Sequence, residues 1–286
     1  MRMRIGWSLA LLLLSATASA QDVRVTPKLK AGDAFRLEVT RVQNSTASPK
    51  EIKSTTTINA RVLTATPEGS TLEWESTDNE IVPGMKPVIR LTRDGELAGL
   101  LNEADVLAKI QSVVDKMRRE LRDKPAAERK AQEAIVELMT PAVIMAAMTR
   151  DAGTYFGLNG VALAMGQSVT VEMTQPNPIG SGTLPVRFNV RIDTATPDIA
   201  VLATTTTYDA AALMRAGLQI MEKIGDPIPP NELAKHPPLQ IGDEGRFVLD
   251  RASGLMREVI TYRRIMMAGQ TRIDRTEFRL VAVPKR

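Results

Sequence analysis

The feature that most constrains how this chain folds is an alternation of apolar and polar residues that recurs along much of its length. It is clear at Phe35, Leu37 and Val39, each of which is followed by a charged or hydroxyl residue. Successive side chains of a β-strand point to opposite faces of a sheet, so this period of two predicts strands with one buried and one solvated face. The same pattern recurs at 52–62, 72–75, 169–171, 186–192, 255–265 and 271–283.

Short turn signals separate these segments. They are Pro67-Glu68-Gly69, Asp94-Gly95, Pro197-Asp198, Ser253-Gly254 and Ala268-Gly269-Gln270. Glycine, proline and aspartate favour the tight turns that join adjacent antiparallel strands. One-sided strands joined by short turns predict an antiparallel sheet with one face buried and the other in water.

Two helical regions interrupt the strands. Between Asn102 and Arg122 apolar residues recur every three or four positions, which predicts an amphipathic helix with Asn102 as its N-cap. Thr140-Pro141 predicts the cap and first-turn proline of a further helical segment, 142–148, and Gly153 is expected to end this block. Another helix is predicted at 209–224, before a proline-rich connector.

The two strand-rich regions share a short sequence. Residues 59–67 and 189–197 are identical at six of nine positions, and each window ends in Thr-Ala-Thr-Pro. We therefore predict an α+β fold with two related antiparallel β-rich lobes, a helical block between them and a helix inserted in the second lobe. The expected boundaries are 21–101 for the first lobe, 102–153 for the helical block and 154–286 for the second lobe, which contains the helix 209–224.

The first 20 residues predict an export signal. Arg2 and Arg4 form a positive region before an apolar stretch that runs from Ile5 to Leu14, and Ala18-Ser19-Ala20 provides a small-residue cleavage site. This stretch is shorter than the roughly 20 apolar residues needed to cross a bilayer, so we expect cleavage and no membrane span in the mature chain. The predicted location is the periplasm or the exterior of the cell.

Composition excludes several kinds of site. The chain has no cysteine and a single histidine, His236, which excludes thiol catalysis, thiolate zinc sites and metal sites with two imidazoles. His236 lies in the proline-rich connector, where we expect solvent around it. Without Arg2 and Arg4, 35 basic residues are balanced by 33 acidic ones, which leaves no basic excess for nucleic acid. We therefore predict no catalytic residues, no cofactor, no metal and no nucleic-acid partner.

Three short motifs carry a resemblance to a known group of proteins. These are Lys30-Ala31-Gly32-Asp33, the Thr-Ala-Thr-Pro turns and Arg93-Asp94-Gly95. With the export signal, they resemble exported bacterial β-rich proteins known only as a domain-of-unknown-function family. The resemblance spans most of the mature chain and implies no activity and no site residues. The expected architecture is also similar to that of periplasmic lipoprotein carriers, in which a curved sheet wraps helices around an apolar cavity.

Methionine is the most distinctive residue type. The chain has 14 methionines, and Met139, Met145 and Met148 lie in the almost wholly apolar stretch 135–148. Such a stretch either belongs to the core or contacts an apolar ligand or partner, because soluble proteins seldom expose a large apolar patch. The ligand-facing interpretation predicts a site formed by Val143, Ile144, Met145, Met148, Phe35, Leu37, Val39 and Phe188.

Two functions remain open from the sequence. The first is a periplasmic, non-enzymatic binding protein for an apolar ligand such as a lipid or an acyl chain. The second is a structural or interaction protein with a filled core and no small-molecule ligand, which docks on another protein of the cell envelope. A solid interior together with a tight cluster of ionisable side chains in a cleft would argue against the first function.

Overall fold

The computed structural model describes residues 22–77, 84–121, 140–177, 183–223, 239–267 and 269–282, with Pro125 and Val136. The predicted export signal at 1–20 and His236 lie outside these residues. The described strands are β1 (Val23–Arg24), β2 (Ala34–Ser45), β3 (Ser48–Thr66), β4 (Gly69–Ser76), β5 (Val88–Thr92), β6 (Leu97–Leu100), β7 (Ala162–Leu163), β8 (Ser168–Pro176), β9 (Thr183–Ala195), β10 (Ile199–Tyr208), β11 (Gln240–Asp250), β12 (Met256–Met267) and β13 (Gln270–Ala282). The helices are α1 (Glu103–Leu121), α3 (Pro141–Tyr155) and α4 (Ala210–Lys223).

Eleven of these strands form one antiparallel sheet, in the order β6-β5-β4-β3-β2-β13-β12-β11-β10-β9-β8. Strands β2 to β6 and strands β8 to β13 are each joined in sequence order, and β2 pairs with β13 where the two runs meet. In that pairing Val39 lies opposite Phe278. The two β-rich regions therefore belong to a single sheet, and the predicted α+β class with antiparallel strands is confirmed.

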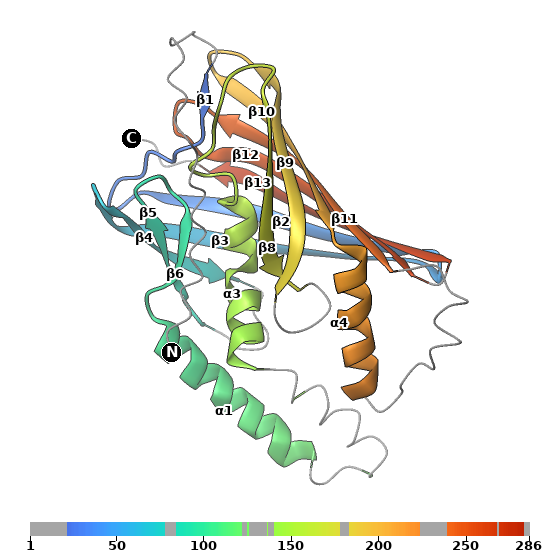
Figure 1. Ribbon diagram of the computed structural model, residues 1–286. Helices are drawn as coiled ribbons and strands as arrows, with labels where there is room; N and C mark the ends of the chain where they lie inside the picture. Colours follow the sequence, from blue (N-terminus) through green and yellow to red (C-terminus); the bar gives the residue numbers. More distant parts are fainter. Residues whose placement is uncertain are drawn as a thin grey trace.

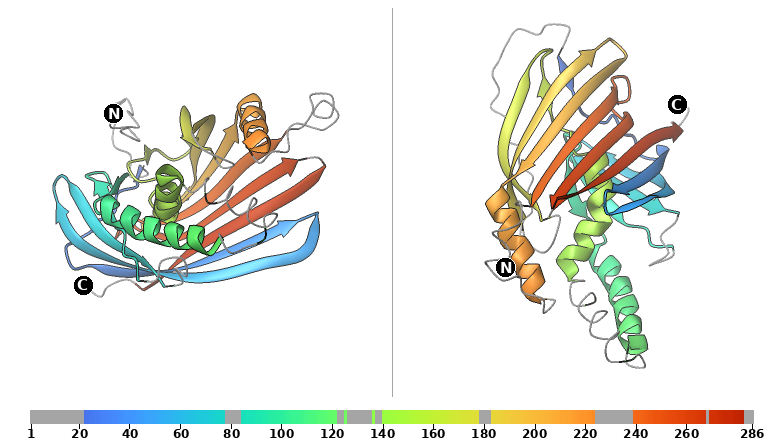
Figure 2. Two further views of the ribbon diagram at one scale, coloured as in Figure 1. Left: turned by 90° about the horizontal axis from the view of Figure 1, so that it is seen from below. Right: turned by 90° about the vertical axis from the view of Figure 1, so that its right-hand side faces the viewer.

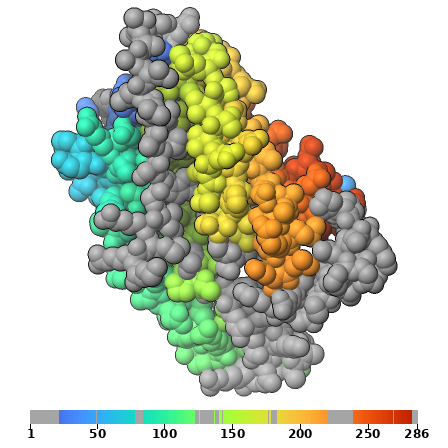
Figure 3. All heavy atoms as spheres, in the orientation of Figure 1, coloured from blue at the N-terminus to red at the C-terminus, as the bar shows by residue number. Residues whose placement is uncertain are grey.

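The sheet is strongly curved, and α3 lies within the curve (Figure 1). Seen along another axis, the strands surround α3 on most sides, while α1 crosses near one end of it (Figure 2). In the space-filling view β8 and β9 form the middle of the visible face, with α4 at their lower end (Figure 3). Helices α1 and α4 thus lie toward one end of the curved sheet, and the short strand β1 lies at the other.

The predicted alternation is confirmed on the concave face of the sheet. Phe35, Leu37 and Val39 are buried, with 4%, 0% and 0% of their surface exposed. On β9, Val186, Val190 and Ile192 are buried, and the intervening Arg187 and Arg191 are exposed. Burying an apolar side chain in this way contributes about 1.5–3 kcal/mol, which explains why the strand register follows the sequence pattern.

The helices begin largely where the sequence predicts. The Thr140 hydroxyl accepts a hydrogen bond from the Val143 N–H (3.3 Å), and Asp209 Oδ1 accepts one from the Ala212 N–H (2.6 Å), so both residues cap their helices. The Asn102 side chain accepts a hydrogen bond from the N–H of Val88, the first residue of β5, and donates one to the carbonyl of Lys86, two residues before that strand.

The predicted end of the helical block at Gly153 is wrong. Helix α3 continues through Gly153 to Tyr155, and Phe156 is its C-cap. A Cβ atom at Gly153 would lie 3.7 Å from the nearest atom, on the Leu97 side chain, which is ordinary contact distance. Packing of the last turn of α3 inside the sheet therefore outweighs the helix-ending preference of glycine.

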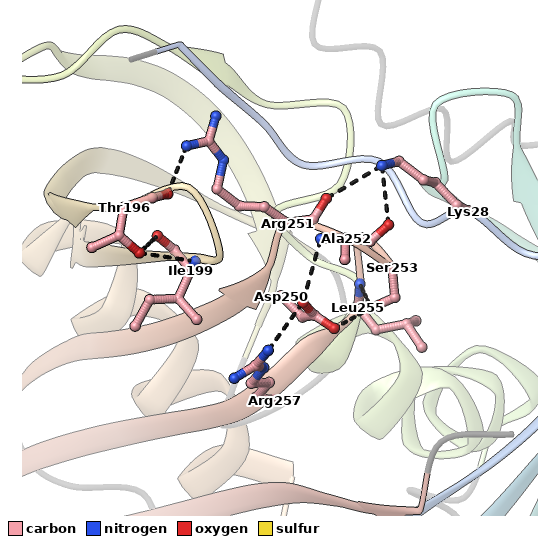
Figure 4. A network of polar contacts seen from close by, with 9 residues as sticks. All are labelled: Lys28, Thr196, Ile199, Asp250, Arg251, Ala252, Ser253, Leu255 and Arg257. Carbon is pink, nitrogen blue, oxygen red and sulfur yellow. Dashed lines mark hydrogen bonds and ion pairs between the residues drawn. The ribbon is translucent and has the colours of Figure 1, made fainter. Parts of the chain in front are cut away.

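An N-terminal segment closes the end of the sheet that lies away from α1 and α4. In this segment, which we call the strap (residues 22–30), Val23 pairs with Leu163 and the Val25 N–H donates to the Val161 carbonyl at 2.9 Å. The Lys28 ammonium group donates to the carbonyls of Arg251 (3.3 Å) and Ala252 (3.0 Å), as Figure 4 shows. The strap thereby ties the start of the described chain to the turn between β11 and β12.

Asp250 organises the turn that the strap contacts. Its carboxylate accepts hydrogen bonds from the Ser253 hydroxyl (2.9 Å), the Ala252 N–H (3.3 Å) and the Arg257 guanidinium (3.2 Å). Partial burial acts to raise the pKa of Asp250, but these hydrogen bonds outweigh burial and the pKa is lowered. The Arg251 guanidinium in turn donates to the Thr196 carbonyl at 2.7 Å, which joins this turn to the β9–β10 turn (Figure 4).

Candidate ligand-binding site

The part of the concave face nearest the strap is filled by the end of α3. Tyr155 is 1% exposed, and its ring centroid lies 5.0 Å from that of Phe156 and 6.2 Å from those of Phe35 and Phe278. The Tyr155 hydroxyl donates a 2.7 Å hydrogen bond to the Met256 carbonyl, which satisfies its one polar group. Burial raises the pKa of Tyr155 far above its ordinary value, so the phenol is neutral.

Four of the eight residues predicted to contact a ligand lie in this core or at its edge. Phe35, Leu37 and Val39 belong to its buried cluster, and Phe188 is half-buried at the edge of the same cluster. The first three side chains are therefore covered by protein atoms in this structure. Of the four, Phe188 alone retains substantial exposed surface.

The predicted helix residues lie in a different cluster. Ile144 is buried there with Val106, Ile110 and Val114 of α1, and Met145 and Met148 are half-buried against this cluster. Val143 is 38% exposed. The structure therefore does not bring the eight predicted residues into one apolar cluster, but divides them between the core under the sheet and the contact of α1 with α3.

Beyond the core, the residues of the concave face change from apolar to polar. Two neighbouring rows of paired positions cross strands β2, β13, β12, β11 and β10. We call these rows the polar band; its first row contains Arg41, Thr276, Thr261, Gly245 and Thr204, and its second row contains Gln43, Asp274, Arg263, Asp243 and Thr206. Because residues directly opposite each other share a face, this register places all ten on the concave side.

Helix α3 contacts the polar band through one ion pair. Arg41 Nη2 lies 2.5 Å from Asp151 Oδ2, and both side chains are partly buried. Residues three and four positions apart lie on the same face of a helix, so Met148, three residues before Asp151, lies on the face of α3 that carries Asp151. Met148 itself is half-buried against the cluster between α1 and α3, one helical turn from this ion pair.

Toward its other end, two members of the polar band, Asp243 of β11 and Arg263 of β12, form a cluster with Tyr208 of β10. Arg263 binds both carboxylate oxygens of Asp243, at 2.8 Å and 2.7 Å, and also donates to the Tyr208 hydroxyl at 3.1 Å. The Tyr208 hydroxyl donates to Asp243 Oδ2 at 2.9 Å. The charges of Arg263 and Asp243 compensate each other. Two hydrogen bonds between one guanidinium and one carboxylate are stronger than hydrogen bonds between neutral groups.

The protonation states of this cluster follow from its burial. Burial raises the pKa of Tyr208 well above its ordinary value, with Asp243 adding to the rise and Arg263 opposing it. Burial acts to lower the pKa of Arg263, but the hydrogen bond and charge of Asp243 outweigh it, and the pKa is raised. At neutral pH the cluster is thus a neutral phenol beside an ion pair. Tyr208 is therefore present as a hydrogen-bonding phenol and not as a phenolate.

On the side of this cluster away from the core, α4 packs on the sheet. Leu213 of α4 is fully buried, in a cluster with Leu184, Val186, Tyr208 and Ile241. Met173 and Ile265 are half-buried against the same cluster. The polar band therefore lies between two apolar regions, one filled by α3 and one covered by α4. Among the described residues, no group of three His, Asp or Glu side chains is placed to hold a metal ion.

The polar band was not found from the sequence. Arg41, Thr204 and Arg263 occupy ordinary positions in alternating strands, and only strand pairing places them in one band across the sheet. One signal was present: the inward positions of β2 change from Phe35, Leu37 and Val39 to Arg41 and Gln43. A polar residue at an inward position of a strand needs a partner, and this change marks where the polar band begins.

In the described part of the chain, no helix is both long enough and apolar enough to cross a membrane. No protein-family model matches the chain, and no curated protein matches its sequence.

Proposed function

We propose that this chain is a periplasmic, non-enzymatic binding protein for an apolar ligand such as a lipid or an acyl chain. One observation carries the proposal: the concave face continues past its filled core as the polar band, whose second row extends through Thr206 to the half-buried Phe188, and the band is contacted by Asp151 of α3, one turn after the half-buried Met148. An amphipathic molecule needs both kinds of contact, apolar for its chain and hydrogen-bonding for its polar end. The export signal predicted at 1–20 is the basis for the proposed location.

The proposed ligand contacts are the half-buried members of the predicted set. Met145 and Met148 supply adaptable apolar surface, because an unbranched thioether adjusts to ligands of different shape. Phe188 supplies a rigid contact from β9. Phe35, Leu37 and Val39 belong to the core against which Phe188 packs. Ile144 anchors α3 against α1, and Val143 lies beside it with 38% of its surface exposed. The hydrogen-bond donors of the polar band take the polar end of the ligand.

The test is ligand binding by delipidated protein. A fluorescent fatty acid is expected to bind at micromolar protein, and Met148→Asp or Met145→Asp should weaken binding at least about tenfold, since a carboxylate next to an acyl chain is costly to desolvate. Met117→Asp is the matched control, because Met117 is 36% exposed on α1 and outside the proposed site. Thermal unfolding of each variant checks that it folds.

Native mass spectrometry of freshly purified protein provides a second readout. A bound lipid mass supports the proposal, and the absence of both this mass and fatty-acid uptake would contradict it. The second function, an interaction protein of the cell envelope without a small-molecule ligand, is favoured by the filled core around Tyr155. It predicts bare protein in the same spectrum.

We also propose that the two β-rich halves arose by duplication. The turn at Lys30–Asp33 and the turn at Ala164–Gln167 have the same bonds: the fourth residue donates its N–H to the first carbonyl and accepts from the first N–H. Gly32 and Gly166 have positive φ angles of 88° and 78°. In this proposal β2–β6 correspond to β8–β12. In both sets, successive strands are added in the same direction across the sheet. A superposition that requires a different strand correspondence would contradict it.

A further inference from the structure

All charged side chains of the polar band are paired with a partner of opposite charge. The pairs are Arg41 with Asp151 of α3, Arg263 with Asp243, and Asp274 with Arg272 of the same strand. The three carboxylates keep only 21–28% of their side-chain surface exposed. Breaking such a partly buried pair is costly, because the group that remains keeps its charge and loses its partner. Within the described part of the chain, the polar band therefore has no net charge and no unpaired cation.

Uncharged hydrogen-bonding side chains lie among these pairs. In the first row Thr261 of β12 lies opposite Thr276 of β13, and in the second row Gln43 of β2 lies opposite Asp274. The side chains of Thr261, Thr276 and Gln43 are half-buried and form no hydrogen bond with another described residue. A hydroxyl or carboxamide group can both donate and accept. These three side chains can therefore bind the hydroxyl or ester groups of a ligand without breaking a bond within the protein.

We propose that the ligand carries an uncharged polar end with hydroxyl or ester groups, as a monoacylglycerol does. The inference rests on the proposed function and names the polar end of the same ligand. A carboxylate or phosphate end would have to take an arginine from its aspartate, or remain without a cation in a half-buried site. A hydroxyl end only replaces water on Thr261, Thr276 and Gln43. A fatty acid should therefore still bind through its acyl chain, but less tightly than the glycerol ester of the same chain.

Competition with the bound fluorescent fatty acid measures this preference. Delipidated protein is titrated with monolauroylglycerol or with laurate, which carry the same acyl chain. Each ligand is kept below its critical micelle concentration, at a pH where laurate is ionised. Monolauroylglycerol is expected to bind at least about tenfold more tightly, since it leaves the three ion pairs intact. This comparison uses the wild-type protein alone, so it does not depend on the folding of a variant.

Asp243→Asn should shift the preference toward the charged ligand. The variant removes one carboxylate and leaves Arg263 with a positive charge that no longer has its partner. The affinity for laurate relative to monolauroylglycerol should rise at least about tenfold, because arginine and a carboxylate form charge-assisted hydrogen bonds. Asp115→Asn is the matched control: it frees Arg118 from a 3.5 Å ion pair on α1, outside the polar band, and should leave the ratio unchanged. Thermal unfolding checks that each variant folds.

Thr261→Val tests the hydroxyl contacts separately. Valine keeps the shape of threonine and removes its hydroxyl group. Monolauroylglycerol should then bind about three- to tenfold more weakly, while laurate binding changes less. An equal loss for both ligands would contradict the role given to this hydroxyl in recognising the uncharged end.

Failure of this inference is distinguishable from failure of the proposed function. Binding of neither ligand by the wild-type protein would contradict both. Equal or tighter binding of laurate would leave the proposed function standing and overturn the uncharged polar end. An unchanged ratio in folded Asp243→Asn would also overturn the inference, because the pairing of Arg263 would then have no part in rejecting a charged end.

Discussion

At the scale of single residues, two glycines with the same backbone conformation have different surroundings. Gly254 has φ +72°, and a Cβ atom there would lie 2.0 Å from the Thr26 carbonyl oxygen of the strap. Gly269 has φ +77°, and a Cβ atom there would meet nothing within 4 Å. Both positions favour glycine, because a left-handed conformation strains other residues by about 1–2 kcal/mol. At Gly254 the close approach of the strap adds a second requirement.

We expect Gly254→Ala to lower the free energy of unfolding more than Gly269→Ala does. Both variants carry the backbone strain, and Gly254→Ala also forces the strap away from the β11–β12 turn, which adds about 1–3 kcal/mol as in other overpacked sites. Urea unfolding of the two variants and wild type measures the difference. Equal losses in the two variants would show that the strap contributes little to stability.

At the scale of secondary-structure elements, the sequence predicted the strands well but not their neighbours. Alternation shows which side chains of β2 face inward, and turn residues show that β2 is followed by β3. Neither shows that β2 also pairs with β13, some 230 residues later in the chain. The candidate site could be predicted only to the same extent, because its parts are joined by this long-range pairing. Met148 and Phe188 are recognisable as apolar, whereas Arg41 and Arg263 become parts of one polar band only through that pairing.

Helix α3 depends on its last turn for its place in the sheet. Tyr155→Ala should lower the free energy of unfolding by about 3–5 kcal/mol, because it leaves a cavity among Phe35, Phe156 and Phe278. Tyr155→Phe keeps the ring and loses the hydrogen bond to the Met256 carbonyl, so the expected loss is about 1–2 kcal/mol. Chemical unfolding separates these values. Similar losses in both variants would mean that the hydroxyl, not the ring, holds α3.

At the scale of the whole molecule, β13 connects the two halves of the sheet. It pairs with β2 on one side and with β12 on the other, so every path of strand pairing from β2–β6 to β8–β12 passes through it. The apolar core follows the same route, since Phe278 of β13 is fully buried between Val39 of β2 and Val259 of β12. Separate lobes would unfold independently, whereas a continuous sheet around one helix should unfold as a unit.

A mature chain ending at Gly269, which lacks β13, is therefore expected to lose its folded structure in both halves, including strands far from the deletion. Removing β13 exposes the inner edges of β2 and β12 and opens the core beside Tyr155. Circular dichroism, limited proteolysis and urea unfolding measure the loss, with a chain ending at Ala282 as the control. The full chain should show a single cooperative transition. If the shortened chain kept a protease-resistant half with its own transition, that half would be an independent domain, and the curved sheet would be an assembly of two lobes.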